Sequence, residues 1–239
     1  MIDKELLARL LEEQGTPADA AQLERLDIYA RLLVEWNEKM NLTGITDPYG
    51  VTVKHMADSL QILPLLPDGA FSLIDVGTGA GFPGVPVAVM RPDCRVTLLD
   101  GLNKRLVFLE AVCAELGLDA VRVHARAEEA ARQSAHRERY DIATARAVAA
   151  LPVLCEYCLP FVKVGGAFIA MKGPDGAAEL AAAQNACRLL GGKPEAPVYR
   201  ELREADGAVG TRLLLPIAKV AHTPDKYPRH GGKIAKSPL

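Results

Sequence analysis

The sequence contains no run of about 18 apolar residues, the length that a membrane-spanning helix requires. Its N-terminus, MIDKELLARLLEEQG, carries acidic residues where a secretory signal would have a basic start and an apolar middle. These two absences predict a cytoplasmic protein that makes no contact with a membrane.

Cysteine is scarce and odd in number, with five residues spread through the 239. A disulfide framework is therefore not expected. Cys155 and Cys158 form a single CxxC with neither a second pair nor nearby histidines, so we expect them to pack on a helix at i and i+3 rather than to bind zinc. No metal site is predicted.

Aromatic residues make up only 5% of the chain, which argues against a stacking platform for long single strands of nucleic acid. The formal net charge is −2 at pH 7, so a nucleic acid would have to bind a local basic patch. The five histidines are scattered and none lies beside a nucleophile pattern, so no catalytic dyad is expected.

The first 66 residues are predicted to be entirely helical. Apolar residues recur at helical spacing from Ile2 to Gln14, and a second helix is predicted to begin with Pro17 in its first turn and to run to Trp36. A third helical segment is predicted at 49–63. In it His55 and Asp58 lie one turn apart, a spacing that fits a structural pair and an RNA contact equally well.

After residue 66, short apolar runs alternate with helical patterns, which predicts βαβ units and an α/β fold with a Rossmann-like, doubly wound, mostly parallel sheet. Residues 193–211 are expected to add a strand and a turn as an antiparallel edge pair. Strands are predicted at 71–76, 95–100, 120–125, 140–145, 166–172 and 211–220, and helices at 86–90, 103–116, 127–133, 149–158 and 175–190.

The chain is thus divided into three parts. A helical N-terminal extension (1–66) precedes the sheet domain (67–222), and a basic C-terminal arm (223–239) follows it. Because the arm has no apolar periodicity, we expect it to be extended.

The stretch LIDVGTGAGFPGV (73–85) can be parsed in two ways. Read as GxGxxG, the dinucleotide fingerprint, it would place Asp75 and Gly77 inside a central buried strand, where both are unfavourable. Read as an acid followed by GxGxG, it ends the strand at Val76 and puts the glycines in the turn. The second parse is favoured, and Gly84 is then assigned to helix packing, a role that any small residue could partly fill.

The second parse favours S-adenosylmethionine over a nicotinamide dinucleotide as cofactor. Asp75 supplies negative charge for an ammonium group, directly or through water, and the glycines let the backbone approach the ligand. Asp100, at the end of the second strand, can hold both ribose hydroxyls, although NAD enzymes also place an acid there. A tight turn with no ligand is a third alternative.

Two later segments are candidates for the same site. RAEE (126–129) either meets the adenine through a backbone amide and a polar side chain or is only a solvated first helical turn. TARAVA (144–149) lies at the edge where substrates bind in open α/β sheets. Arg146 needs a partner in these apolar surroundings, so we expect it in the site.

Together, these motifs resemble the bacterial 16S ribosomal RNA guanine-N7 methyltransferase family, also called the glucose-inhibited division protein B family or ribosomal RNA small subunit methyltransferase G. The resemblance runs nearly end to end, with Gly101 where the family usually has Ser and Ile234 where it usually has Pro. It is carried by NLT (41–43), HMADSL (55–60), DVGTGAGFPGVPVAV (75–89), LLDGLNKRLVFL (98–109), RAEE (126–129), YDIATARAVAAL (140–151), KVGGAFIAMKG (163–173) and YPRHGGKIAKSPL (227–239).

The resemblance implies a class I methyltransferase fold and S-adenosylmethionine as methyl donor. It implies methylation of N7 of a specific guanine in the 530 loop of 16S rRNA, in the 30S subunit or its precursor, by a monomer. The alternatives are a methyltransferase acting on another RNA, a small molecule or a protein, an NAD-dependent oxidoreductase, and a non-catalytic RNA-binding factor. The family's cofactor contacts fall at Gly77, Phe82, Ala127, Glu128 and Arg146.

Guanine N7 has a lone pair and no proton, so its methylation needs positioning and electrostatics rather than a general base. We expect Arg146 to orient the guanine through O6. The expected cofactor-binding residues are Asp75, Gly77, Gly79, Gly81, Phe82, Asp100, Ala127, Glu128 and Arg146, and the expected RNA-binding residues are Lys163, Lys172, Arg229, Lys233 and Lys236.

Overall fold

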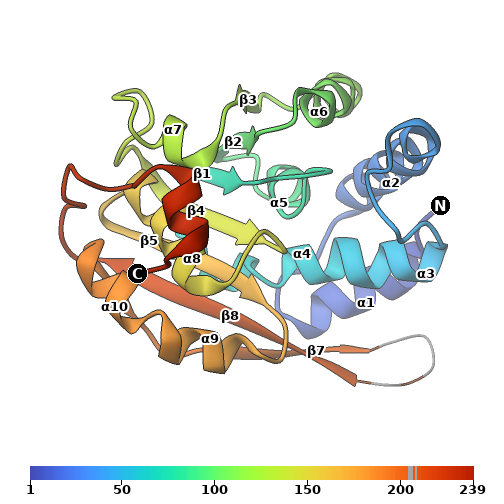
Figure 1. The fold of residues 1–239 in the computed structure, drawn as a ribbon. Helices are drawn as coiled ribbons and strands as arrows, with labels where there is room; N and C mark the ends of the chain where they lie inside the picture. Colours follow the sequence, from blue (N-terminus) through green and yellow to red (C-terminus); the bar gives the residue numbers. More distant parts are fainter. Residues whose placement is uncertain (204–206, 208) are drawn as a thin grey trace.

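The computed structural model describes residues 1–203, 207 and 209–239, which fold around one mixed β-sheet (Figure 1). The strand order is β3-β2-β1-β4-β5-β8-β6, and β7 also pairs with β8. Strands β1 to β5 run parallel to one another. Strand β8 runs antiparallel to its three partners β5, β6 and β7. The predicted α/β fold is confirmed. The strands are β1 (Phe71–Val76), β2 (Cys94–Asp100), β3 (Val121–His124), β4 (Tyr140–Arg146), β5 (Val162–Lys172), β6 (Gly192–Pro194), β7 (Val198–Arg203) and β8 (Val209–Lys219).

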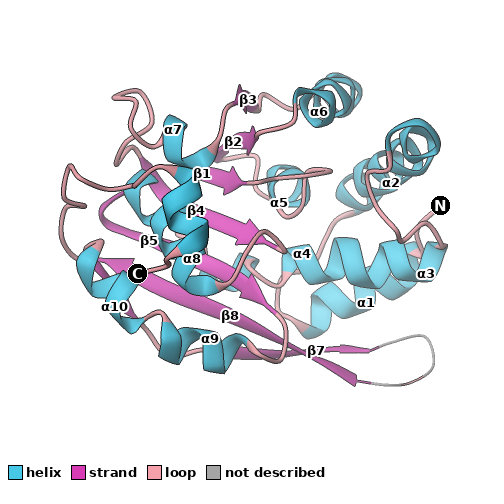
Figure 2. Ribbon diagram, in the orientation of Figure 1, coloured by secondary structure: helices cyan, strands magenta, loops and turns pink. Residues whose placement is uncertain are grey.

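Helices cover both faces of the sheet (Figure 2). They are α1 (Lys4–Glu13), α2 (Ala20–Met40), α3 (Pro48–Gly50), the π-helix η1 (Val51–Ala57), α4 (Asp58–Leu60), the 3-10 turn η2 (Leu63–Leu65), α5 (Gly84–Met90), α6 (Asn103–Leu116), α7 (Ala127–Ala130), α8 (Leu151–Cys158), the 3-10 turn η3 (Leu159–Phe161), α9 (Gly176–Ala182), α10 (Gln184–Leu189) and α11 (Gly231–Lys236).

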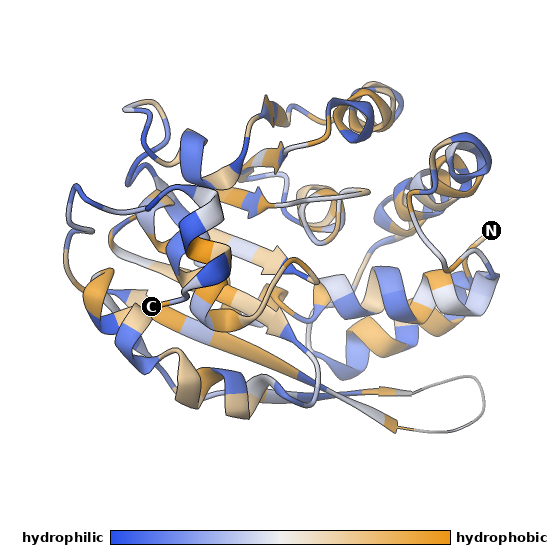
Figure 3. Cartoon of the chain, in the orientation of Figure 1, coloured by the Kyte–Doolittle hydropathy of each residue, from blue (hydrophilic) through white to orange (hydrophobic). Residues whose placement is uncertain are grey.

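Alternate residues of the central strands enter two separate cores. In β1, Leu73 belongs to the core that includes α1, α2, α5 and α6, whereas Ile74 belongs to the core that includes α8 and α10. Successive side chains of a strand point to opposite faces, so each core lies on its own side of the sheet. The strands are accordingly apolar along much of their length, and β8 is largely orange in Figure 3.

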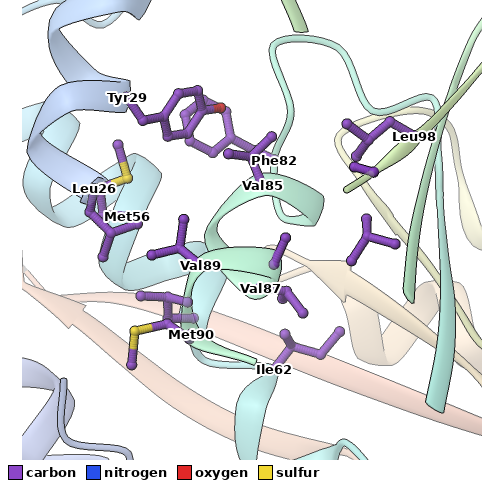
Figure 4. Packing of buried hydrophobic residues seen from close by; sticks show 14 of the residues in the cluster. Leu26, Tyr29, Met56, Ile62, Phe82, Val85, Val87, Val89, Met90 and Leu98 are labelled. Atoms are coloured by element: carbon purple, nitrogen blue, oxygen red, sulfur yellow. The ribbon is translucent and has the colours of Figure 1, made fainter. Parts of the chain in front are cut away.

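The N-terminal extension shares a core with the sheet domain. Leu26 and Tyr29 of α2 and Met56 of η1 are fully buried in one cluster with Val85 and Val89 of α5 (Figure 4). Burial of aliphatic side chains of this size contributes about 1.5–3 kcal/mol each. The extension is therefore built into the domain that carries the glycine loop.

Several predicted boundaries are wrong in detail. Pro17 precedes α2 instead of lying in its first turn, because the side chain of Asp19 caps the helix through the amide of Gln22. The helix predicted at 127–133 ends at Ala130, and the one predicted at 175–190 is divided at Ala183. The predicted edge pair forms from β7 and β8, and part of the predicted turn, residues 204–206 and 208, lies outside the described residues.

The C-terminal segment is not the extended arm that was predicted. Its last residues form α11, whose Ile234 is completely buried, and α11 packs beside α8. Arg229 turns inward to the fully buried carboxylate of Glu156. Its Nε atom donates to Oε1 at 2.9 Å, its Nη2 atom donates to Oε2 at 2.6 Å, and its backbone amide donates to Oε1 at 2.7 Å. A buried ion pair and the buried side chains of Ile234 and Tyr227 fix a segment that has no sequence periodicity.

Replacement of Arg229 by alanine is expected to lower the free energy of unfolding by about 3–5 kcal/mol, because it leaves the Glu156 charge buried without a partner. Chemical denaturation of the purified protein measures this loss. Lys233→Ala, at an exposed position of the same segment, serves as the control and should change stability by less than about 0.5 kcal/mol. Equal losses in the two variants would contradict the prediction.

Candidate active site

The glycine loop follows β1 as the second parse predicts. β1 ends at Val76, and the amides of Gly77 and Thr78 both donate to the carbonyl of Leu99, at 2.9 and 3.0 Å. Gly77, Gly79 and Gly81 have φ angles of 71°, 61° and 105°, in the left-handed region that favours glycine. A β-carbon at Gly77 would also lie 2.8 Å from the side chain of Val148, so two loops approach closely here.

Asp75 holds the glycine loop in place through hydrogen bonds. Its carboxylate is fully buried and accepts hydrogen bonds from the Thr78 hydroxyl (2.7 Å) and the Gly84 amide (2.9 Å) through Oδ2. Burial raises the pKa of Asp75 to about 6. Its Oδ1 is buried and has no hydrogen-bond partner among the described residues, so it is the one carboxylate oxygen left for a ligand or a water molecule.

Gly84 begins α5 in close contact with the strands, as expected for a helix-packing glycine. A β-carbon there would lie 2.5 Å from the Leu98 side chain and 2.9 Å from the Asp75 carboxylate. The expectation that any small residue could partly fill this role is therefore wrong, because even a methyl group lacks room.

Asp100 joins the end of β2 to the glycine loop. Its carboxylate accepts hydrogen bonds from the Gly79 amide at 2.9 Å and the Leu102 amide at 2.8 Å, and it pairs with Arg105 at 3.2 Å. A β-carbon added at Gly79 would make only an ordinary contact, with the Gly77 carbonyl oxygen 3.9 Å away. The hydrogen bond from the Gly79 amide thus joins the loop to the Asp100 carboxylate at the end of β2.

Phe82 is enclosed by three aromatic or cationic groups. The His55 ring stacks on it with centroids 4.6 Å apart, the Tyr29 ring lies at 5.2 Å, and the Arg146 guanidinium lies 4.9 Å above its face. The Tyr29 hydroxyl also donates to the carbonyl of Ala80 at 2.5 Å. The N-terminal extension therefore holds the glycine loop in place directly.

Arg146 leaves the end of β4 and meets η1 and α4. It donates to the Asp58 carboxylate at 2.8 Å and to the Lys54 carbonyl at 3.1 Å, while Arg212 of β8 donates to the other Asp58 oxygen at 3.0 Å. His55 and Asp58 do not pair with each other, because the His55 Nε2 atom lies 2.7 Å from the Thr43 hydroxyl instead.

A pocket of about 490 Å³ opens beside Arg146. Its wall carries charges of both signs: Asp58 lies between two arginines, and Lys172, at the end of β5, pairs with Glu179 at 2.8 Å. Apolar residues such as Met171 complete the lining. Sequence patterns did not single out Arg212 or Glu179, since neither lies in a recognisable motif.

Ala127 and Glu128 begin α7, just after β3. Glu128 is buried, with its carboxylate 3.9 Å from Nε of Arg126, whose own side chain is exposed. Gly101 faces Arg126, and a β-carbon at this position would lie 3.2 Å from the flexible Arg126 side chain. The serine that is usual in the family could therefore be accommodated by a small movement of Arg126.

The five residues predicted to bind RNA do not form one cluster. Lys172 is in the pocket, whereas Lys163 is at the opposite end of β5 and pairs with Asp141. Arg229 is bound to Glu156, as described above. Lys233 and Lys236 are exposed on α11.

The comparisons with known proteins decide the family. A family model described as rRNA small subunit methyltransferase G matches residues 22–203. The chain belongs to this family. Relatives named ribosomal RNA small subunit methyltransferase G are 49% identical in Alkaliphilus metalliredigens and 48% identical in Acetivibrio thermocellus, each over 100% of both chains. A further relative, from Brevibacillus brevis, is 46% identical over 99% of each chain.

Solved structures agree on the fold. Precorrin-6y C5,15-methyltransferase from Geobacter metallireducens is similar with a TM-score of 0.50 and 13% identity, over 69% of this chain and 88% of that one. P. horikoshii TYW2, solved in complex with MeSAdo, is similar with a TM-score of 0.50 and 15% identity, over 63% and 58%. The predicted class I methyltransferase fold is confirmed, and membership of this family agrees with the predicted enzyme class and the predicted cofactor, S-adenosylmethionine.

Among the described residues, no helix combines the length and apolarity needed to cross a membrane. No group of three or more His, Cys, Asp or Glu side chains in this part of the chain is arranged to hold a metal ion.

His55→Gln is expected to remove part of the acid sensitivity of the fold. Burial, together with the charge of Arg146, lowers the pKa of His55 from 6.5 to about 4. Below its ordinary pKa the unfolded chain takes up a proton at His55 that the folded protein does not, so stability falls as the pH drops through this window. The wild type should lose up to about 3 kcal/mol more than the variant between the two pKa values.

Urea unfolding at several pH values measures this difference. His124→Gln, which replaces an exposed histidine, is the control and should follow the wild type. Parallel curves of stability against pH for the wild type and His55→Gln would contradict the lowered pKa of His55.

Proposed function

We propose that this protein transfers a methyl group from S-adenosylmethionine to N7 of a specific guanine in the 530 loop of 16S rRNA. The observation that carries the proposal is one juxtaposition. Arg146 contacts both parts of the site: its guanidinium lies 4.9 Å over Phe82, at the end of the glycine loop, and the same residue lines the charged pocket. Family membership supports small-subunit rRNA as the substrate. We further propose that a cytoplasmic monomer acts on the 30S subunit or its precursor.

The residues of the glycine loop fit a bound donor. The side-chain-free backbone at Gly79, the carboxylate of Asp100 and the unpartnered Oδ1 of Asp75 suit a ligand with ribose hydroxyls and an ammonium group. Because Asp75 is fully buried, we assign it to shaping the loop and to a contact through Oδ1 alone. Ala127 and Glu128, at the start of α7, are assigned to the adenine. When bound, S-adenosylmethionine supplies an electrophilic sulfonium methyl group.

The pocket beside Arg146 suits a guanine. A carboxylate such as Asp58 can accept hydrogen bonds from the N1 and N2 groups of the base, and an arginine can donate to O6. N7 carries a lone pair and no proton, so this chain has to orient the base and exclude water, and no side chain has to remove a proton. Neutral His55 lies behind Phe82 and is assigned no proton transfer.

RNA binding outside the pocket is assigned to two exposed lysines of α11. Lys233 and Lys236 lie exposed on α11, where they can meet phosphates, and Lys172 is placed to act inside the pocket. Arg229 and Lys163 are left out of this surface, since Arg229 is bound to a buried carboxylate and Lys163 lies at the other end of its strand.

Asp100→Asn is expected to raise the Kd for adenosylhomocysteine by about tenfold, because a neutral amide is a weaker partner for two ribose hydroxyls than a carboxylate. Isothermal titration calorimetry measures the change. Asp119→Asn, at an exposed position, is the control. Unchanged binding by Asp100→Asn would contradict the assignment of Asp100.

Arg146→Ala is expected to reduce the rate of rRNA methylation by about 100-fold or more. Its effect on stability should be smaller, because Asp58 keeps Arg212 as a partner when Arg146 is removed. Transfer of labelled methyl groups to 30S subunits measures the rate, and Arg95→Ala, at an exposed position at the far end of β2, is the control. A methylation rate equal to that of the wild type would contradict the role assigned to Arg146.

The substrate itself is tested by reduction and aniline cleavage of ribosomal RNA from a strain that lacks the gene. Loss of one cleavage site in the 530 loop, restored by the wild-type gene and not by Arg146→Ala, is the expected result. An unchanged cleavage pattern would favour another RNA or a small molecule as substrate. Tight binding of NADH with no binding of adenosylhomocysteine would favour an oxidoreductase.

A further inference from the structure

The C-terminal segment reaches the residues that the proposed function assigns to adenine. Gly231, the first residue of α11, lies directly against the carboxylate of Glu128 in α7. A β-carbon added at Gly231 would overlap Oε1 of Glu128 and lie 2.9 Å from its Cδ atom. The position of the Glu128 carboxylate therefore depends on the absence of a side chain at residue 231.

The segment that carries Gly231 is held firmly on both sides. Arg229 is bound to buried Glu156, and Ile234 is completely buried. Arg132 donates to the Pro228 carbonyl at 2.5 Å, and Arg137 donates to the Tyr227 carbonyl at 2.9 Å. Because the segment cannot easily withdraw, an added side chain at residue 231 would have to displace the flexible end of Glu128 instead.

We propose that Gly231 is a positioning residue for the methyl donor and acts through Glu128. The segment forms an outer wall at the adenine end of the site, and Gly231 leaves just enough room for the Glu128 carboxylate to accept a hydrogen bond from an exocyclic amino group. This inference rests on the proposed function, because it takes Glu128 as a partner of the adenine.

Alanine is a selective probe at this position. Gly231 does not have a positive φ, so alanine can adopt its backbone conformation, and the atoms that it would meet are the end of a flexible side chain. The expected effect is a displaced carboxylate in a folded protein. Gly232 offers a matched control in the same helical turn, where an added β-carbon would lie 3.5 Å from the His230 ring, an ordinary contact.

The experiment compares full-length Gly231→Ala and Gly232→Ala with the wild type. Gly231→Ala should raise both the Kd for adenosylhomocysteine and the KM for S-adenosylmethionine by about tenfold, with kcat and Tm close to those of the wild type. Gly232→Ala should match the wild type in all four quantities. A purely structural role of Gly231 would lower Tm without this separation of KM from kcat.

The Glu128→Ala background tests whether the two residues act together. If Gly231 acts through Glu128, Gly231→Ala should have no further effect on Kd once the carboxylate is removed. Additive effects, or wild-type binding by Gly231→Ala, would overturn the inference while leaving the proposed function intact. A wild-type protein that binds no adenosylhomocysteine would overturn the proposed function, and this inference with it.

Discussion

The packing around Phe82 is the interaction on which the rest of the site depends. One ring contacts Tyr29 from α2, His55 from η1 and Arg146 from β4, so three segments that are distant in sequence meet at the glycine loop. Stacked and cation–π contacts are individually modest, at about 0.5–2 kcal/mol. Their effect is geometric, because they fix the glycine loop and Arg146 relative to each other, and Arg146 in turn lines the pocket.

Much of the fold could be predicted from local pattern. β1 and α6 match their predicted ranges, since an apolar strand before a glycine turn and a regular apolar helix face are strong local signals. The position of the acid before the glycines also identified the correct parse of the loop. Boundaries were missed where a cap or a divided helix decided them, as at Asp19 and Ala183.

The partners of the site residues could not be predicted in the same way. Arg146 was expected to need a partner, but the identity of that partner depends on how η1 packs against β4, a contact across 88 residues of sequence. Arg212 meets the same carboxylate across 154 residues. The C-terminal segment shows the same limit, because long-range contacts such as the buried pair between Arg229 and Glu156 fix it without any periodic pattern.

The sharing of Asp58 by two arginines has an electrostatic consequence. One carboxylate between two guanidinium groups leaves an excess positive charge at the pocket, while the neighbouring pair of Lys172 and Glu179 is neutral as a unit. A concave, partly apolar wall focuses the field of such a charge. A chain with a net charge of −2 can in this way present an attractive potential to a polyanion at this part of its surface.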